Sequence, residues 1–127
     1  MNKCILVVDD DREVREILSF VLKHHGFEVI VASNGAQIQP LLLQRVPDLI
    51  LLDVMMPGED GFRLCRYLRQ SPLTQHIPIM IMTAHAEDIY QRISRDVGAS
   101  QHITKPFHPL DLAEKVKALL DTKKIEN

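Results

Sequence analysis

The sequence contains little cysteine, no marked excess of one charge and no long hydrophobic run. Its two cysteines, Cys4 in an expected core strand and Cys65 on an expected helix, are typical of buried free thiols rather than of a disulfide. The 15 basic and 17 acidic residues leave a net charge of −2, so the chain offers no general field for nucleic acid, and no block of like charges forms a tail. The longest apolar stretches fall far short of the ~20 residues of a membrane-spanning helix.

Repeats, linkers and a leader segment are also missing from the chain. Residues 1–4 run directly into an expected strand and leave no room for a signal peptide. With 127 residues the chain can form one hydrophobic core, and we expect a domain at residues 1–122 followed by a short tail at 123–127. These features predict a cytoplasmic protein that does not enter a membrane and does not bind nucleic acid directly.

Short aliphatic runs alternate with amphipathic segments five times along the chain. An aliphatic run of this length bounded by charge is typical of a buried parallel strand. The runs predict five strands, at residues 4–8, 28–32, 48–52, 77–82 and 100–103. Five βα units with short connections predict a parallel sheet with helices on both faces. We therefore expect an α/β fold of the flavodoxin-like (βα)5 class with strand order 2-1-3-4-5, an order adopted from doubly wound proteins rather than derived.

The segments between the runs have the periodicity of helices with one buried face. In the first segment, apolar residues recur every three or four positions, at Val14, Ile17, Leu18, Val21 and Leu22. Four later segments repeat the pattern, and Pro40 is expected to shorten or kink the first of these. Gly26 and Gly98 each follow a periodic segment and mark helix ends. Either Asp10 or Asp11 is expected to cap the first helix.

Three acidic residues stand where two of these strands end. Asp9 and Asp10 follow the first strand, and Asp53 follows the third. The ligand site of an open α/β sheet lies beyond the carboxyl ends of its strands, and the expected order makes strands 1 and 3 neighbours. Three carboxylates in one small space repel one another unless protons or a cation hold them there. We therefore predict an oxygen-rich pocket for a hard divalent cation such as Mg²⁺, beside which a carboxylate can attack phosphorus.

Two further strand ends supply groups that suit a phosphoryl group. Strand 4 ends at Thr83, and strand 5 leads into Lys105 and Pro106. A hydroxyl and an ammonium that face the acidic pocket would give phosphoryl oxygens one hydrogen-bond donor and one counter-charge. Lys105 alone also fits a role as an ion-pair partner for the acids, and the two roles are compatible.

Together these motifs resemble the receiver domain of two-component response regulators. The resemblance extends from residue 3 to about residue 120 and rests on Val7-Val8-Asp9-Asp10, Leu51-Leu52-Asp53-Val54-Met55-Met56-Pro57-Gly58, Thr83-Ala84 and Lys105-Pro106-Phe107. It implies a phosphorylation-activated switch rather than a classical enzyme. Such a switch catalyses its own phosphoryl transfer and a slow autodephosphorylation. A sensor histidine kinase or a histidine phosphotransfer protein would supply the phosphoryl group.

The resemblance also implies a role for each residue of the acidic pocket. Asp53 would be the phospho-acceptor. Asp9 and Asp10 would bind Mg²⁺, or Mn²⁺ as a substitute, together with Asp53 and the backbone carbonyl of Met55.

For the phosphoryl group, the resemblance implies that Thr83, Ala84 and Lys105 bind its oxygens and that the Lys105–Pro106 peptide bond is cis. Phosphorylation would then shift the surface formed by helix 4, strand 5 and helix 5. The sequence around Lys105 is similar to that of receivers in winged-helix transcription factors, which implies a homodimer that forms on phosphorylation.

The sequence departs from the family pattern at His102, where a switch residue is usually Tyr or Phe. A histidine is smaller and titrates near neutral pH, so it predicts weaker or pH-sensitive coupling, while a half-exposed histidine without a role fits equally well. Met55 and His85 would flank the water that attacks the acyl phosphate. Neither is an acid or an amide that orients water, which predicts a phosphorylated form lasting minutes or longer.

In the family, the first helix and the loop after strand 5 dock the phosphoryl donor. Val14, Ile17, Pro106 and Phe107 are therefore candidate contacts. Val14 and Ile17 also fit the core face of their helix, and Phe107 fits either a contact or a loop anchor.

Two other functions compete with the switch. A haloacid-dehalogenase-like phosphatase or phosphotransferase also uses an aspartyl nucleophile with Mg²⁺, but it carries Asp-x-Asp after strand 1, where this chain has adjacent acids. A flavodoxin-type FMN module needs a phosphate loop at the position where Asp9, Asp10 and Asp11 would repel phosphate. The chain also has no Gly-rich nucleotide loop.

Overall fold

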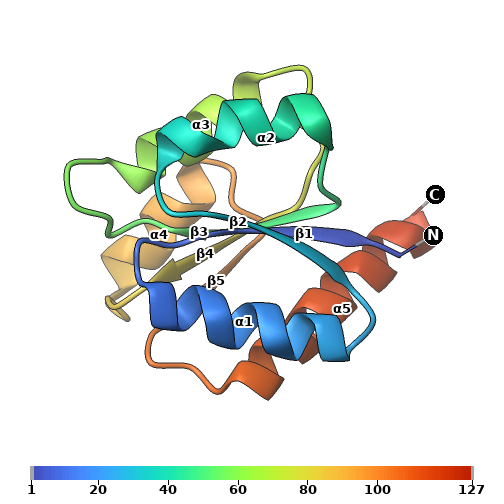
Figure 1. The fold of residues 1–127 in the computed structure, drawn as a ribbon. Helices are drawn as coiled ribbons and strands as arrows, with labels where there is room; N and C mark the ends of the chain where they lie inside the picture. The colour runs from blue at the N-terminus through green and yellow to red at the C-terminus, as the bar shows by residue number, and fades with distance from the viewer. Residues whose placement is uncertain (1, 127) are drawn as a thin grey trace.

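Five short parallel strands form the centre of the molecule, with helices on both faces of their sheet (Figure 1). The computed structural model describes residues 2–126, and it describes side chains through residue 121. The strands are β1 Cys4–Val8, β2 Glu28–Ala32, β3 Leu49–Asp53, β4 Ile79–Thr83 and β5 Gln101–Thr104. They are parallel throughout and lie in the order β2-β1-β3-β4-β5, which confirms the predicted flavodoxin-like fold.

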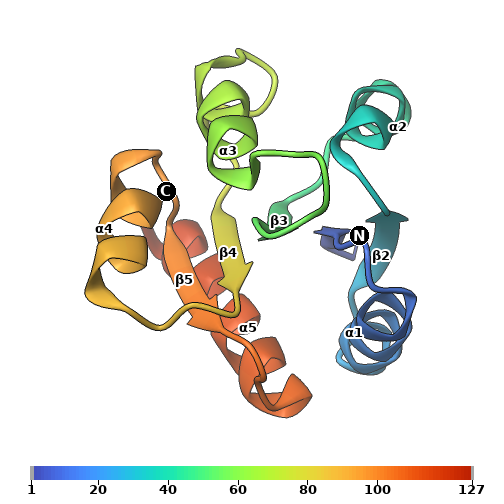
Figure 2. The same cartoon turned by 90° about the vertical axis from the view of Figure 1, so that its left-hand side faces the viewer.

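The helices form two layers (Figures 1 and 2). One face of the sheet is covered by α1 Arg12–His24 and α5 Pro109–Glu126. The other face is covered by α2 Ile38–Gln44, which follows a 3-10 turn η1 at Gly35–Gln37, and by α3 Gly61–Gln70 and α4 Asp88–Asp96. Because parallel strands are buried on both faces, every residue of the three inner strands is buried, whereas the edge strand β2 is partly exposed.

Local sequence signals set the helix ends. The Asp11 side chain accepts a hydrogen bond from the Glu13 N–H and caps α1, which confirms that one of the two candidate aspartates does so. Gly26 and Gly98 have φ angles of +92° and +95°, the left-handed conformation that ends a helix and favours glycine. The helix that contains Pro40, α2, has only 7 residues.

The predicted strand boundaries differ from the observed ones by one or two residues at β3, β4 and β5. The ladder of β4 begins at Ile79 rather than at residue 77, because Pro78 has no N–H to donate. At the other end, Asp53 and Thr83 are themselves the last residues of their strands and belong to the ladders. The sheet therefore holds these two site residues directly, without an intervening loop.

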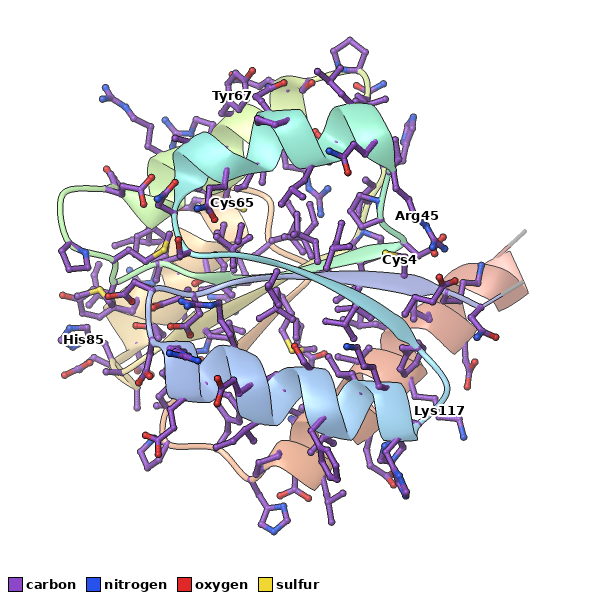
Figure 3. The ribbon with its side chains drawn as sticks, viewed as in Figure 1. Cys4, Arg45, Cys65, Tyr67, His85 and Lys117 are labelled. Carbon is purple, nitrogen blue, oxygen red and sulfur yellow. The ribbon has the colours of Figure 1, made fainter. Side chains whose placement is uncertain are left out.

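Three expectations about the whole chain can be compared with the structure. Cys4 and Cys65 are both buried and free, as predicted, and they lie in different layers (Figure 3). The backbone of α5 continues through Glu126 and includes residues 123–126 of the expected tail, so the division at residue 122 stays a prediction; residue 127 lies outside the described residues. Within the described part of the chain, no helix combines the length and apolar character that a membrane crossing requires.

Candidate functional site

The three acidic residues meet at the carboxyl end of the sheet, the end that faces the viewer in Figure 2. Strands β1 and β3 are neighbours, with Val8 paired to Leu52, so the residues that follow emerge side by side. One carboxylate oxygen from each of Asp9, Asp10 and Asp53 lies within 4.8 Å of the other two. Asp9 and Asp53 are buried and Asp10 is exposed, so the cluster has a closed floor and is open to solvent on one side.

Asp9 is held on four sides. Its backbone N–H donates to the Ala32 carbonyl at 3.1 Å, and its backbone carbonyl accepts from Nη1 of Arg15 at 2.8 Å. Its Oδ1 accepts from the Asp11 N–H at 2.9 Å, and its Oδ2 accepts from Nζ of Lys105 at 2.7 Å. Arg15 was not anticipated from the sequence, where it is one charge among several on the exposed side of the first helix.

Asp53 is a buried carboxylate that is only partly neutralised. Its Oδ1 accepts a hydrogen bond from the Met55 N–H at 3.0 Å, and its Oδ2 lies 3.5 Å from Nζ of Lys105. Burial, with a smaller contribution from the negative charge of Asp9, raises the pKa of Asp53 to about 6. The hydrogen bond from Met55 and the positive charge of Lys105 lower this pKa but do not cancel the effect of burial. The carboxylate therefore lies in a place that favours a further positive charge.

Lys105 follows β5 and contacts two of the acids, and Thr83 ends β4, the strand between β3 and β5. The Lys105 N–H donates to the Thr83 carbonyl at 2.7 Å, which ties the two strand ends together. Burial disfavours the Lys105 ammonium, but the hydrogen bond to Asp9 and the two acidic charges outweigh it and raise the pKa of Lys105. Thr83 is fully buried, and its Oγ1 accepts from the His85 N–H at 3.1 Å. The Lys105–Pro106 peptide bond is cis.

His85 lies in the loop after β4 and projects from the same end of the molecule (Figure 3). Its ring stacks on Tyr90 with centroids 4.3 Å apart and planes 11° apart. Its Nδ1 lies 3.5 Å from a Glu87 carboxylate oxygen. The loop beside Thr83 is thus coupled to the first turn of α4, a connection that the sequence analysis did not anticipate. Met55, the other candidate beside the site, has a side chain that is 47% exposed.

His102 lies apart from the acidic pocket. Together with Gln91, Arg95 and Thr104 it lines a groove between α4 and β5. Its Nε2 is buried and has no hydrogen-bond partner among the described residues. Burial lowers the pKa of His102, and the His85 backbone opposes this shift.

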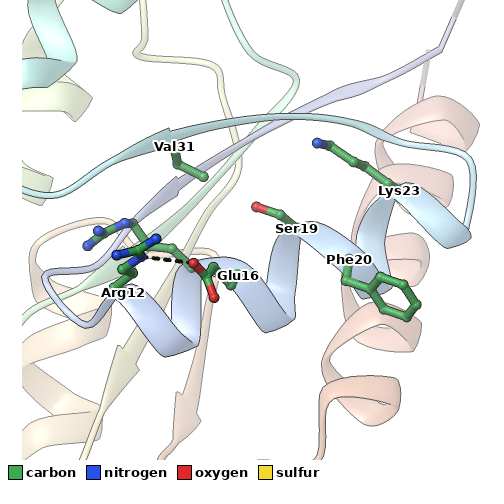
Figure 4. Close-up of a pocket in the computed structure, with 7 residues that line it drawn as sticks. Arg12, Glu16, Ser19, Phe20, Lys23 and Val31 are labelled. Carbon is green, nitrogen blue, oxygen red and sulfur yellow. Dashed lines mark hydrogen bonds and ion pairs between the residues drawn. The ribbon is translucent and has the colours of Figure 1, made fainter.

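Among the described residues, two hollows flank α1, and neither is lined by the three acids. A cavity of about 230 Å³ between α1 and the loop after β5 is lined by Val14, Ile17, Leu18, Lys105, Pro106, Phe107 and Pro109. Ile17 is 45% exposed, whereas Val14 and Phe107 are half-buried and pack against the core. A larger groove of about 480 Å³ runs between α1 and the edge strand. Arg12 and Glu16 form an ion pair of 2.9 Å at one end of it, and the exposed Phe20 lies further along α1 (Figure 4).

The pocket has the donor set of a hard-cation site. Its carboxylate oxygens are the ligands that Mg²⁺ prefers, and the side of the cluster that is open to solvent admits the waters that the ion usually keeps. The only ammonium that contacts the two buried acids in the described residues is Lys105. A divalent cation would relieve the repulsion that remains.

The raised pKa of Asp53 predicts how stability depends on pH without Mg²⁺. The folded state binds the Asp53 proton more tightly than the unfolded state does. The contribution of Asp53 to the free energy of unfolding should therefore become more favourable as the pH falls from above 6 toward 4. Over this pH range we expect the free energy of unfolding to rise by roughly 1–3 kcal/mol relative to that of Asp53→Asn. Urea unfolding of both proteins at several pH values measures this difference. Parallel pH profiles for the two proteins would contradict the burial of a charged Asp53.

Comparisons with known proteins agree with this geometry. Residues 5–117 match the family model described as the response regulator receiver domain. The chain is 42% identical over 120 residues to the phosphate regulon transcriptional regulatory protein PhoB of Pseudomonas aeruginosa, covering 94% of this chain and 52% of that protein. It is 41% identical to the alkaline phosphatase synthesis transcriptional regulatory protein PhoP of Bacillus subtilis, covering 94% and 49%.

Among solved structures, a CheY-like response regulator receiver domain protein from Methanospirillum hungatei superposes with a TM-score of 0.90 at 28% identity, and all of both chains is covered. The chain thus matches a whole receiver structure, while it spans about half the length of the curated relatives.

Proposed function

The chain belongs to the response regulator receiver domain family, whose members are phosphorylation-activated switches of two-component signalling, and we propose that Asp53 is the residue that accepts the phosphoryl group in the cytoplasm. The observation that carries this assignment is the position of Asp53 at the end of β3, buried within a cluster of three carboxylates and 3.5 Å from the Lys105 ammonium. The match over residues 5–117 leaves no support for the phosphatase or the flavodoxin alternative.

Receiver domains use Mg²⁺ at an acidic pocket, and this chain has such a pocket. In the proposal, the ion is held by Asp9, Asp10 and Asp53 and by the backbone carbonyl of Met55, with Mn²⁺ as a substitute. When bound, the ion neutralises the charge that develops on the transferring phosphoryl group.

The phosphoryl donor is a phosphohistidine of a sensor histidine kinase or of a histidine phosphotransfer protein. A carboxylate oxygen of Asp53 forms a bond to phosphorus while the phosphorus–nitrogen bond breaks, and the imidazole leaves with that electron pair and takes up a proton. Lys105, which now donates to Asp9 at 2.7 Å, and Thr83 then bind the phosphoryl oxygens together with the Ala84 N–H.

The donor protein docks at the cavity between α1 and the loop after β5 in this proposal. Ile17 and Pro106 are exposed there, so they form direct contacts, while Val14 and Phe107 are half-buried and support the cavity wall. This arrangement places the contact surface next to Lys105, which lines the cavity and reaches into the acidic pocket. Binding and phosphoryl transfer therefore share one side of the molecule.

Phosphorylation adds about −1.5 to −2 charge next to Thr83 and Lys105. In the structure, Oγ1 of Thr83 accepts a hydrogen bond from the His85 N–H. Movement of Thr83 toward the phosphoryl oxygens therefore pulls on His85 and on the loop that leads into α4. The surface of α4, β5 and α5 changes as a result, and a phosphorylation-dependent homodimer is the proposed output of this face.

The lifetime of the acyl phosphate tests the site directly. Incubation with acetyl phosphate and Mg²⁺ should give one acid-labile phosphoryl group per chain that persists for minutes or longer, because Met55 and His85 offer no carboxylate or amide to orient water. Intact-protein mass after removal of the donor measures the decay, and Met55→Asn should shorten it several-fold. Loss of the label within seconds from the unaltered protein would contradict the assignment of these two residues.

His102 is the proposed switch residue. In the His102→Tyr variant, a larger ring at the same position of β5 should fill the space that Thr83 vacates and increase the difference in self-association between phosphorylated and unphosphorylated protein. Sedimentation of both forms measures this difference, with the exposed His76→Tyr as the matched control. An unchanged difference in His102→Tyr would remove His102 from the mechanism.

A further inference from the structure

Arg69, in the last turn of α3, is a half-buried cation without a carboxylate partner among the described residues. Its guanidinium is surrounded by carbonyl oxygens instead. Nε donates to the Gly98 carbonyl at 2.7 Å, and Nη1 donates to the carbonyls of Ile77 at 2.5 Å and Gln75 at 3.2 Å. Nη2 donates to Oγ of Ser100 at 3.1 Å. Burial lowers the pKa of Arg69, as expected for a charge stabilised only by dipoles.

These bonds join the end of α3 to the turn that follows it and to a connection that lies 29 to 31 residues further along the chain. Gln75 and Ile77 lie in the turn before β4, while Gly98 and Ser100 connect α4 to β5. Oγ of Ser100 also accepts from the Ile79 N–H at 3.2 Å, so one hydroxyl links the guanidinium to the first residue of β4. Bonds from a charged donor are the stronger kind, and a planar guanidinium fixes the direction of each.

The same cluster closes the C-terminal end of α4. The Gly98 N–H donates to the Arg95 carbonyl at 3.0 Å, and the Ala99 N–H donates to the Ser94 carbonyl at 2.9 Å. Gly98 has a φ of +95°, and a Cβ at this position would come within 2.7 Å of Cγ of Arg69. The chain thus packs directly on the Arg69 stem, and the positive guanidinium lies at the negative end of the helix dipole.

The N-terminal end of α4 is held differently. Its N-cap, Glu87, makes no side-chain cap bond, and Ser94 is the one fully buried residue of the helix. Tyr90 stacks on His85 and, with ring centroids 6.4 Å apart, on Phe62. His85 in turn donates its N–H to Thr83, so this end is attached to the acidic pocket.

From these contacts we propose that Arg69 is a positioning residue that fixes the C-terminal end of α4, so that phosphorylation makes the helix pivot about that end. The proposal rests on the proposed function, because it takes Thr83 as the group that moves. The α4–β5 face then changes most near Tyr90 and least near Gly98. Arg69 touches neither the acids nor the phosphoryl group, and it acts only through the position of α4.

Hydrogen exchange of the whole chain, with and without beryllofluoride and Mg²⁺ as a phosphoryl mimic, tests the pivot. In the unaltered protein, exchange should change in residues 85–91 and stay constant in 97–100. In Arg69→Met, exchange at 97–100 should be about tenfold faster at rest and should now respond to the mimic. The exposed Arg66→Met, in the same helix, is the matched control and should behave like the unaltered protein.

Arg69→Lys keeps the stem and the charge and should give an intermediate result even if Arg69→Met does not fold. The pivot would be overturned if the mimic changed hydrogen exchange equally at both ends of α4 in the unaltered protein. It would also be overturned if exchange at 97–100 stayed slow and did not respond to the mimic in Arg69→Lys and Arg69→Met. The absence of any response to the mimic, at either end of α4 in the unaltered protein, would instead contradict the proposed function itself.

Discussion

Asp53→Asn is expected to reduce phosphoryl incorporation from acetyl phosphate at least about a thousandfold, because a carboxamide lacks the charged oxygen that attacks phosphorus. Among the side chains that the structure describes, no other carboxylate combines burial, the Lys105 ammonium and a position at the end of β3. Asp9 is equally buried, but both of its carboxylate oxygens already accept hydrogen bonds. Intact-protein mass after incubation with acetyl phosphate and Mg²⁺ measures the loss.

Asp11→Asn is the matched control for this experiment. Asp11 lies next to the acidic cluster but caps α1, and asparagine caps helices equally well. We expect this variant to be phosphorylated normally. Labelling of Asp53→Asn to the level of the unaltered protein would place the acceptor elsewhere and remove the basis of the proposed site.

Lys105→Met is expected to lower the free energy of unfolding by about 1–3 kcal/mol without Mg²⁺, because it leaves two buried carboxylates without a counter-charge. Lys105 lies 2.7 Å from Asp9 and 3.5 Å from Asp53, and its side chain is only 22% exposed, so solvent screens these pairs little. Millimolar Mg²⁺ should restore most of the loss, since the ion would supply positive charge to the same oxygens. Thermal unfolding with and without Mg²⁺ measures both effects.

Lys117→Met controls for the removal of a lysine charge. Lys117 is exposed on α5, away from the acidic pocket (Figure 3), and its replacement should leave the Mg²⁺ response unchanged. The electrostatic account of the pocket is wrong if Lys105→Met is as stable as the unaltered protein in the absence of Mg²⁺. It is also wrong if Mg²⁺ stabilises neither protein.

Much of the fold was predictable because its determinants are local. The five aliphatic runs are buried strands since a parallel sheet is covered on both faces, and the first two strands have the predicted bounds. Gly26 and Gly98 end their helices as predicted, and one of the two candidate aspartates, Asp11, caps α1, because caps and left-handed residues depend on a few neighbouring backbone groups. The strand ends were less predictable, since the ladder continues through Asp53 and Thr83 as long as a neighbouring strand offers partners.

The identity of the acids at the pocket follows from the ends of the aliphatic runs together with the strand order, because acids that end two adjacent parallel strands must meet. The groups that surround these acids depend on the packing of the whole fold. The Arg15 bond to the Asp9 carbonyl, the His85–Tyr90 stack and the Arg69 cluster join positions between 5 and 31 residues apart. Such contacts follow from how helices pack on the sheet. The periodicity of apolar residues and the spacing of motifs do not predict the direction in which a long side chain points.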